Sequence, residues 1–327
     1  MSAEAVAPAV ACAAAAGVIA LLRRHARRLP RSTPNSRTLH QGEVPRAGGV
    51  AILAGALAGF MVAPPALPGA MAPWGVAMAM VAAVSFADDV RSVPVVLRLV
   101  VQLGAALLAA SQIEGFQASP FLLVALALGI AWGANLFNFM DGSDGLAASM
   151  AIVGFASYAI AASLAGAPWG SHASIAAAVA PFLAVNRPRA SMFMGDVGAV
   201  PLGFVAAAFG AAGWVRGDWP AWFPLIVFMP FLADATLTLF LRALRAEPVW
   251  RAHRSHFYQR LNTLGAGHRG TLAIYVASML ACSTLAIACL VLAPAHGFAA
   301  LCVVALAHAC GFALIDYHCR HQQGAGL

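Results

Sequence analysis

Apolar residues fill most of the chain in long stretches, which short polar or Gly- and Pro-rich segments separate. A helix needs about 20 apolar residues, within a range of about 17 to 25, to cross a bilayer. The pattern therefore predicts an all-α, polytopic membrane protein with about 11 transmembrane helices, in which residues 1–327 form one catalytic domain. The helices are expected at residues 5–22, 48–64, 71–87, 95–112, 120–138, 146–165, 172–186, 199–214, 221–241, 271–292 and 297–316.

The amino-acid composition is also typical of a protein that lies in a lipid bilayer. Hydrophobic residues make up 61% of it and charged residues only 9%, whereas about 25% of the residues in soluble proteins are charged. The net charge is +7, and every basic residue is an arginine. In a membrane protein such charge is first a signal of topology, so nucleic-acid binding is not expected. The six cysteines contain no CxxC pair and are expected to be small buried side chains.

The arginines predict an orientation in the membrane. They follow the first, third, seventh, ninth and eleventh expected helices, so 18 of the 19 lie on one side and only Arg216 lies on the other. Because arginine-rich loops remain in the cytoplasm, the N-terminus is predicted outside and the C-terminus in the cytoplasm. The arginines follow the apolar stretch at 5–22 rather than precede it, which favours a spanning helix over a signal peptide.

The acidic residues are few, and five of the 12 fall at predicted cytoplasmic ends of helices. Asp88 and Asp89 end the third helix. Two adjacent carboxylates repel each other, so they are either a helix cap in a solvated loop or a metal site or acid–base pair. On the opposite side, Glu4, Glu114 and Asp218 are expected only to solvate loops.

Amides and carboxylates follow one another at the end of the fifth helix. Asn135 and Asn138 are three residues apart, so a helix places them on one face. Asp141 and Asp144 come next, each followed by a glycine. Such a group at a membrane-embedded helix end is costly without partners. A plain glycine-rich turn does not account for the amides, so a functional segment is predicted.

Asp196 follows Gly195 in a third polar segment, which runs from Asn186 to Gly198. Hard cations such as Mg²⁺ take carboxylate and carbonyl oxygens together with substrate phosphates. Asp196 is therefore predicted as a metal ligand, and a compatible alternative is the N-cap of the eighth helix. Asp234 differs because it falls inside the ninth helix. It is either functional, or protonated, or satisfied by a neighbouring helix, and the sequence leaves these alternatives open.

The last polar segment contains His253, Arg254, His256 and Arg260. Two interpretations remain: an amphipathic helix on anionic lipid, or a phosphate-binding loop. Zinc is not expected because no thiolate accompanies the histidines. Carboxylates, amides and cations on one membrane face together suit phosphoryl transfer. No Walker A segment is present, which argues against ATP hydrolysis of that kind.

Five segments resemble, in order, those of the polyprenyl-phosphate N-acetylhexosamine-1-phosphate transferases of glycosyltransferase family 4. The phospho-N-acetylmuramoyl-pentapeptide transferase of peptidoglycan synthesis is a relative of this family. The matching segments are residues 34–40 with 45–49, 88–89, 135–147, 193–198 and 253–261. Each segment alone is weak, but their shared order makes the resemblance specific.

The resemblance implies an activity. A UDP-N-acetylhexosamine would donate its sugar-1-phosphate to undecaprenyl phosphate and release UMP, which starts a cell-envelope polysaccharide such as O-antigen. The family also implies Mg²⁺ or Mn²⁺, a bacterial inner (cytoplasmic) membrane with the active site facing the cytoplasm, and a homodimer as one form of assembly. Direct attack by the lipid phosphate is preferred to a covalent phospho-aspartate route, which the sequence leaves open.

The same resemblance implies the roles of individual residues. Asp88, Asp89 and Asp196 would be catalytic, and Asn138 and Asp196 would hold the metal ion. The substrate-binding residues would be Asn135, with Asp141, Asp144, Asn186 and Phe193 near the nucleotide, and His253, Arg254 and His256 at the pyrophosphate or sugar.

Two departures from the family pattern are present. Ala199 stands where a serine is common, and the histidine segment reads His-Arg-Ser-His-Phe-Tyr-Gln. The second departure favours the polysaccharide-initiating branch, with a 6-deoxy sugar as one donor, over the peptidoglycan enzyme. Two alternative classes are weaker. A secondary transporter needs helices broken near the midplane with charges there, and only Asp234 is that deep. A lipid phosphotransferase of the CDP-alcohol type needs an arginine soon after Gly145, and none occurs before Arg187.

Overall fold

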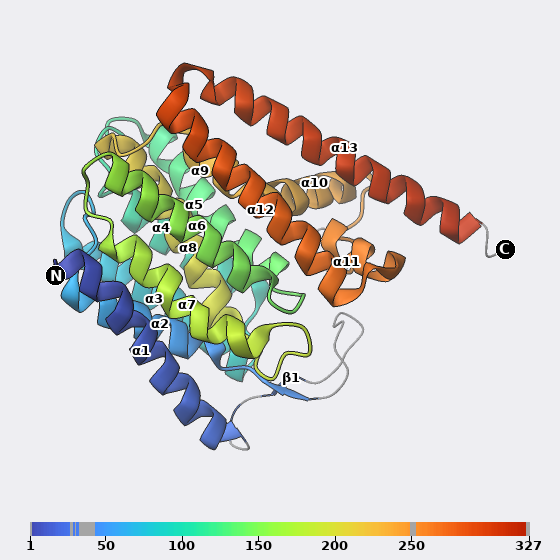
Figure 1. The fold of residues 1–327 in the computed structure, drawn as a ribbon, viewed down its shortest axis with the longest axis horizontal. Helices are drawn as coiled ribbons and strands as arrows, with labels where there is room; N and C mark the ends of the chain where they lie inside the picture. The colour runs from blue at the N-terminus through green and yellow to red at the C-terminus, as the bar shows by residue number, and fades with distance from the viewer. Residues whose placement is uncertain (1, 27–28, 30, 33–42, 249–252, 325–327) are drawn as a thin grey trace.

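The computed structural model describes residues 2–26, 29, 31–32, 43–248 and 253–324, and nearly all of its regular structure is helical (Figure 1). Each of the predicted apolar segments is helical in this part of the chain. The long helices are α1 (Ala3–Arg24), α2 (Gly48–Val62), α3 (Met71–Val90), α4 (Val95–Ala110), α5 (Pro120–Met140), α6 (Leu146–Leu164), α7 (Gly170–Asn186), α8 (Asp196–Arg216), α10 (Met229–Leu244), α12 (Gly267–Leu292) and α13 (Gly297–Gly324).

Short elements complete the described structure. They are β1 (Arg31–Ser32) paired with β2 (Val44–Pro45), α9 (Trp222–Val227), α11 (Phe257–Leu261), a π-helical turn η2 (Asn262–Ala266) and a 3₁₀ turn η3 (Pro294–His296). The expected single helix over 221–241 is wrong in one respect, because it is divided into α9 and α10 at Phe228. Pro230 lies in the first turn of α10, where its missing N–H group costs no helical hydrogen bond.

The apolar helices make the chain a multi-pass membrane protein. Among the described residues, seven helices are long and apolar enough to cross a membrane: α1, α3, α5, α6, α8, the continuous segment Phe257–Leu292 and α13. The apolar helices α2 and α4 are shorter, at 15 and 16 residues. The all-α, polytopic fold is thereby confirmed. The total of 11 spanning helices and their orientation stay predictions.

Small residues let the central helices approach closely. α8 is buried along most of its length, whereas α13 lies at the edge of the bundle and is mostly exposed (Figure 1). Gly133 of α5 and Gly203 of α8 face each other, and a Cβ atom on Gly203 would collide with the backbone carbonyl of Gly133. Membrane helices associate through such small residues because lipid provides no hydrophobic force between them.

Two of the acidic residues form specific contacts in the loops that are predicted to lie outside. Glu4 accepts hydrogen bonds from the backbone N–H groups of Trp169 and Gly170, where α7 begins. Asp218 is 8% exposed and pairs with Arg216. The expectation that these two acids only solvate loops is therefore wrong. Glu4 accepts from N–H groups at the start of α7, and Asp218 neutralises the charge of Arg216 at the end of α8.

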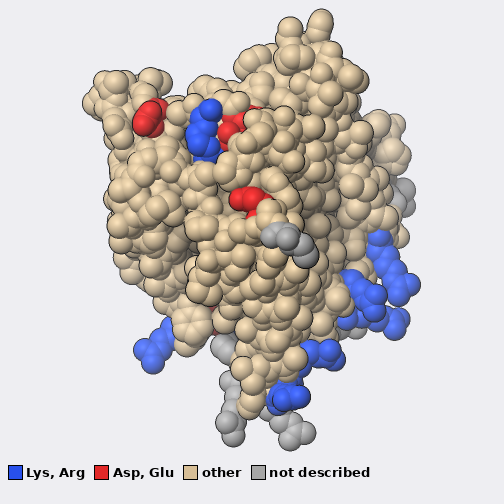
Figure 2. Space-filling model, turned by 60° about the vertical axis from the view of Figure 1, so that its left-hand side comes forward, with Lys and Arg blue, Asp and Glu red and all other residues tan. Residues whose placement is uncertain are grey.

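The polar loops of α3, α5, α7 and α10 meet at the other end of the bundle. On the face shown in Figure 2, most basic side chains gather towards this end, and much of the flank is free of charged side chains. The candidate residues of the sequence fall in these loops, so the fold brings together segments that are more than 100 residues apart along the chain.

Candidate active site

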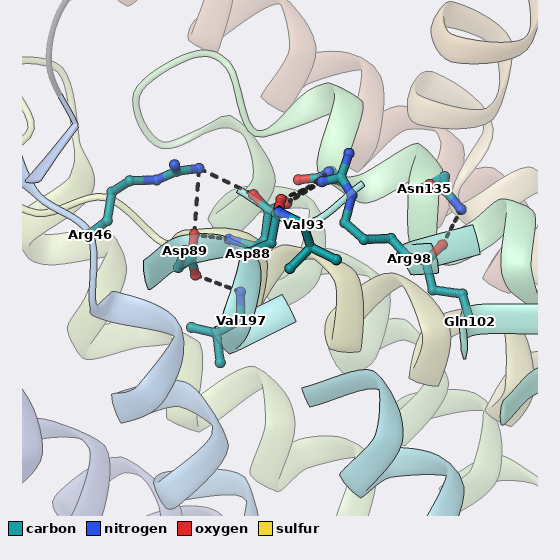
Figure 3. A network of polar contacts seen from close by, with 10 residues as sticks. Arg46, Asp88, Asp89, Val93, Arg98, Gln102, Asn135 and Val197 are labelled. Carbon is teal, nitrogen blue, oxygen red and sulfur yellow. Dashed lines mark hydrogen bonds and ion pairs between the residues drawn. The ribbon is translucent and has the colours of Figure 1, made fainter. Parts of the chain in front are cut away.

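Four polar segments meet where α3 ends and α8 begins. Asp88 and Asp89 lie in the last turn of α3, Asp196 is the first residue of α8, and Asn138 lies in the last turn of α5. Arg46 reaches the same place from the segment before α2, and Arg98 reaches it from α4 (Figure 3). Three of the predicted catalytic residues are thus in one cluster, together with a predicted metal ligand.

Backbone hydrogen bonds dock the segment around Arg46 onto the loop before α8. The Phe193 N–H donates to the Pro45 carbonyl at 2.9 Å, and the Gly48 N–H donates to the Phe193 carbonyl at 2.9 Å. The Gly49 N–H donates to the Met194 carbonyl at 2.8 Å. Phe193, predicted to lie near the nucleotide, is therefore part of the framework that places Arg46. The other half of this predicted segment, residues 34–40, lies outside the described residues.

Two guanidinium groups hold the Asp196 carboxylate from opposite sides. Arg46 Nη2 is 3.1 Å from Asp196 Oδ1, and Arg98 Nη1 is 3.2 Å from Asp196 Oδ2. The side chain of Asp196 is only 10% exposed. Paired and hydrogen-bonded carboxylates tolerate such burial. The carboxylate is therefore held in one orientation at the mouth of the bundle.

Asp89 forms the N-terminal cap of α8 from a different helix. Its Oδ1 accepts the Asp196 N–H at 3.0 Å, and its Oδ2 accepts the Val197 N–H at 2.9 Å (Figure 3). The first N–H groups of a helix have no partner within the helix, and a negative charge there is favourable. The alternative of Asp196 as the N-cap is therefore wrong, because Asp196 is already helical and Asp89 caps the helix in its place.

We expect Asp89→Ala to lower the free energy of unfolding by about 1–2 kcal/mol, the usual cost of losing a helix cap. Asp89→Asn should cost less, because an asparagine oxygen also caps a helix well. Thermal unfolding in detergent micelles measures both variants. Ser119→Ala serves as the control, since Ser119 caps α5 through a long 3.5 Å hydrogen bond from the Leu122 N–H. Equal stability of Asp89→Ala and wild type would contradict the assigned capping role.

Asp88 orients Arg98. Its Oδ2 pairs with Arg98 Nη1, and its Oδ1 accepts the Val93 N–H at 2.7 Å, which also fixes the turn after α3. Arg98 then extends to Asp196. The adjacent carboxylates of Asp88 and Asp89 thus point to different partners, which offsets their mutual repulsion.

Asn138 and Asp141 complete the cluster from the end of α5. Asn138 Nδ2 lies 3.4 Å from Asp196 Oδ2. Burial raises the pKa of the Asp141 carboxyl well above its usual range. The charges of Asp196, Asp89 and Asp144 raise this pKa further, while Arg46 opposes the rise. Because carboxyl groups outnumber the guanidinium groups around Asp141 among the described residues, this place favours an additional cation.

The donor set is compatible with Mg²⁺ in its chemistry. Asp196, Asp141 and Asn138 offer carboxylate and amide oxygens, which are the ligands that this hard cation prefers. In the described part of the chain, no three His, Cys, Asp or Glu side chains stand close enough to form a ready-made metal cage. Mg²⁺ is usually bound by one or two carboxylates together with substrate phosphates, and this arrangement fits that pattern.

Three predicted substrate-binding residues connect parts of the protein to one another. Asn135 donates to Gln102 Oε1 at 2.7 Å, so its amide faces α4 rather than Asp196. Asn186 is buried, accepts the Gly145 N–H and donates to the Met192 carbonyl, both at 2.9 Å. Asp144 accepts the backbone N–H groups of residues 189 and 190 at 3.0 and 3.2 Å. The contacts of Asn186 and Asp144 hold the loops after α5 and α7 side by side.

The histidine segment lies against the end of α5. The ring of His256 stacks on Phe139 at 5.9 Å and on His253 at 4.9 Å. The Tyr258 hydroxyl donates to the Phe139 carbonyl at 3.1 Å, beside the Asp141 loop. Of the two interpretations left open for this segment, the amphipathic surface helix is not what the described residues form. The ordered helix α11 has only five residues, and Phe257 and Tyr258 are buried.

Arg254 occupies a different place from the two histidines. It is exposed and lines a hollow of about 570 Å³ between α10, α11 and α13. The hollow is lined by Arg245, Arg254, Ser255, Arg260, Thr263, Asp316, Cys319 and Arg320. Arg260 and Arg320 both pair with Asp316, at 2.5 and 2.6 Å. The contact of Arg254 with substrate therefore stays a prediction, and the lining of this hollow includes none of the Asp196 cluster.

Neither arginine of the cluster is among the site residues predicted from the sequence: Arg98 is only a signal of topology there, and Arg46 is such a signal and a member of the matching segment 45–49. Arg98 lies one turn inside an otherwise apolar helix, four residues before Gln102, so both share one helix face. That spacing was a usable signal. Arg46 lies in the matching segment 45–49, but its contact with Asp196 depends on the backbone pairing with Phe193, which the sequence does not show.

Carboxylates bridged by two arginines thus meet at one end of an apolar helical bundle. Comparisons with known proteins show what this arrangement resembles. Residues 71–213, which include Asp88, Asp89, Asn138 and Asp196, match the family described as glycosyl transferase family 4. Over these residues the chain resembles this family, as the sequence segments indicate.

Individual relatives show the same resemblance. A probable undecaprenyl-phosphate N-acetylglucosaminyl 1-phosphate transferase of Bacillus subtilis is 28% identical over 260 residues, which cover 74% of this chain and 73% of the relative. An undecaprenyl-phosphate α-N-acetylglucosaminyl 1-phosphate transferase of Yersinia pestis is 29% identical, over 53% of this chain and 52% of its own. A phospho-N-acetylmuramoyl-pentapeptide-transferase of Thermotoga neapolitana is 35% identical, over 38% and 39% of the two chains.

Proposed function

We propose that the protein transfers N-acetylhexosamine-1-phosphate from a UDP-sugar to undecaprenyl phosphate, releases UMP, and so starts a cell-envelope polysaccharide such as O-antigen. The reaction takes place at the cytoplasmic face of the bacterial inner membrane. The observation that carries the proposal is the Asp196 carboxylate clamped between Arg46 and Arg98 at the end of an apolar bundle. The names of the Bacillus and Yersinia relatives supply the reaction class.

The chemistry is a displacement at phosphorus. An oxygen of the lipid phosphate attacks the β-phosphorus of the UDP-sugar, and the bond from that phosphorus to the UMP oxygen breaks. A phosphate monoester has its second pKa near 6, so most of the acceptor is already a dianion at neutral pH. Asp88 therefore serves better as a positioning residue for Arg98 than as a base. Arg98 and Arg46 are placed to bind phosphate oxygens, since a guanidinium binds them in a fork.

Asp196, Asn138 and Asp141 would hold the Mg²⁺ ion of this reaction. The ion supplies positive charge to the phosphate oxygens on which negative charge accumulates. The raised pKa of Asp141 supports this placement, because a carboxyl group among other carboxyl groups gains most from an added cation. The end of α5 and the beginning of α8 are joined here by Asn138 and Asp196.

The structure gives the transporter alternative little support. The division between α9 and α10 at Phe228 is the kind of break that such proteins use. However, the hollow beside this break, about 330 Å³, is lined almost entirely by apolar or small residues such as Gly133, Phe137 and Leu232. A polar substrate would find few hydrogen-bonding partners there.

The test is transfer by the purified protein in nanodiscs that contain undecaprenyl phosphate. Each UDP-N-acetylhexosamine, including a 6-deoxy donor, is supplied with Mg²⁺ or Mn²⁺, and lipid-linked sugar and UMP are measured. We expect one UMP for each lipid-linked product, no product after chelation of the metal, and recovery when the metal is restored. Absence of product with every UDP-N-acetylhexosamine in the presence of metal would refute the proposal. Product that survives chelation would refute the metal assignment alone.

A further inference from the structure

α10 has a buried polar face within an apolar bundle. Asp234, Thr238 and Arg242 are four residues apart and are 0%, 1% and 9% exposed, respectively. Residues at this spacing lie on one side of a helix. Thr238 donates to Asp234 Oδ1 at 3.2 Å, so the first two residues of this buried polar face are hydrogen-bonded to each other. Polar groups at such depth are costly without partners. Their partners lie in the histidine segment, in α12 and, for Arg242, also at Glu247 and the Pro248 carbonyl.

Asp234 binds the backbone and the ring of the segment around His256. Its Oδ1 accepts the Phe257 N–H at 3.0 Å and lies 3.3 Å from His256 Nδ1. Its Oδ2 accepts the Tyr258 N–H at 2.9 Å and the Tyr275 hydroxyl at 2.5 Å. Of the alternatives left open by the sequence, satisfaction by neighbouring elements is the one observed. Since every partner is a donor, Asp234 has the hydrogen-bond pattern of a carboxylate.

Arg242 holds His253 through a serine. Arg242 Nη1 donates to Ser255 Oγ at 3.3 Å, and Ser255 Oγ lies 2.7 Å from His253 Nδ1. An arginine can only donate, so the serine accepts from Arg242 and has its own hydrogen free for the ring nitrogen. The Ser255 N–H also points to His253 Nδ1, at 3.3 Å. His253 Nδ1 is therefore an acceptor.

These contacts set opposite tautomers on two stacked rings. His256 must carry a hydrogen on Nδ1 to donate to Asp234, which leaves its Nε2 as an acceptor while the ring is uncharged. His253 accepts at Nδ1, which places its hydrogen on Nε2. Burial lowers the pKa of His253 to about 4, and the positive charges of Arg242 and Arg260 lower it further. His253 is thus a neutral ring at physiological pH.

We propose that the Asp234–Thr238–Arg242 face of α10 is a positioning element that presents two different Nε2 atoms to the donor sugar nucleotide. His253 Nε2–H donates to an oxygen of the diphosphate, and His256 Nε2 accepts a hydrogen bond from a hydroxyl or amide N–H of the sugar. This inference rests on the proposed function for the identity of the ligand, but the tautomers themselves do not depend on it. From the sequence, the whole histidine segment was expected at the pyrophosphate or the sugar. The inference assigns the diphosphate to His253 and the sugar to His256.

The first test is a double-mutant cycle between Asp234 and His256. Asp234→Asn should lower kcat/KM about 100-fold, because a displacement of about 1 Å of a group that positions the substrate can cost that much in rate. In a His256→Gln background, the same change should cost less than about 3-fold, because the group that Asp234 positions is already absent. Tyr275→Phe is the matched control, since it removes one donor to Asp234 without touching His256. Equal losses in both backgrounds would overturn the positioning role and leave only support of α11.

The second test needs no catalysis. Protein labelled with ¹⁵N-histidine is examined by solid-state NMR, and His253→Gln and His256→Gln identify the two sets of ring signals. We expect a protonated Nδ1 on His256, a protonated Nε2 on His253, and loss of the His256 pattern in Asp234→Asn. The same tautomer on both rings would overturn the inference. If the wild type makes no lipid-linked sugar but the tautomers are as expected, the proposed function fails and the positioning element stands.

Discussion

Asp196→Asn is expected to lower the rate of sugar-1-phosphate transfer about 10²- to 10³-fold, comparable to removing one preorganised electrostatic group from an active site. Asparagine keeps the shape of the side chain but removes its charge. Arg46 at 3.1 Å and Arg98 at 3.2 Å then lose the carboxylate that holds both of them in place. The amide also offers a weaker oxygen to a metal ion. The loss should therefore appear mainly in kcat and in the concentration of Mg²⁺ that the reaction needs.

Asp218→Asn is the matched control for this experiment. Asp218 is also buried and also pairs with an arginine, but it lies at the opposite end of the bundle. It should lower the melting temperature by a few degrees and leave the rate of transfer per folded molecule unchanged. Transfer and membrane content are measured for both variants. Wild-type turnover by Asp196→Asn would remove Asp196 from the active site, and an equal loss in both variants would show that only stability had changed.

The helical framework could be predicted from the sequence because lipid permits few alternatives. A spanning backbone must satisfy its hydrogen bonds internally, so each long apolar stretch is a helix. The observed bounds differ from the expected ones by a few residues, except that α13 continues to Gly324 instead of ending at residue 316. The break at Phe228 was not predicted. Pro230 was the available signal, but a proline in the first turn of a helix and one inside a helix look alike in an apolar sequence.

The membership of the cluster could be predicted, but the partners of each residue could not. Asp88 and Asp89 are equivalent in the sequence, yet one orients Arg98 and the other caps α8. That difference arises because successive residues of a helix point about 100° apart, towards different neighbours. Asp234 could not be assigned for a similar reason. Its partners at residues 256–258 and 275 follow it by 22 to 41 positions, and only the packed bundle brings them together.

The second large effect is expected from Gly49→Ala, because α2 and α8 touch there through their backbones. A Cβ atom on Gly49 would collide with the N and Cα atoms of Gly198, and would lie 2.8 Å from the Val197 carbonyl carbon. Backbone atoms at a helix start cannot move aside as a flexible side chain can. Overpacking of this kind costs about 1–3 kcal/mol. It would also separate Arg46 from Asp196, and a displacement of about 1 Å in an active site can cost about 10²-fold in rate.

Gly75→Ala in α3 provides the control, since no heavy atom outside its own helix lies within 4 Å of a Cβ atom built there. Alanine is the better helix former by about 0.5–1 kcal/mol, so this variant should be as stable as wild type or slightly more stable. Melting temperature and transfer rate are measured for both variants. Because Gly49 lies three residues from Arg46 and its N–H donates to Met194, both quantities should fall together in Gly49→Ala. A fall in stability with an unchanged rate per folded molecule would mean that Arg46 keeps its contact without the close approach of α2 to α8, and that the arginine clamp does not depend on it.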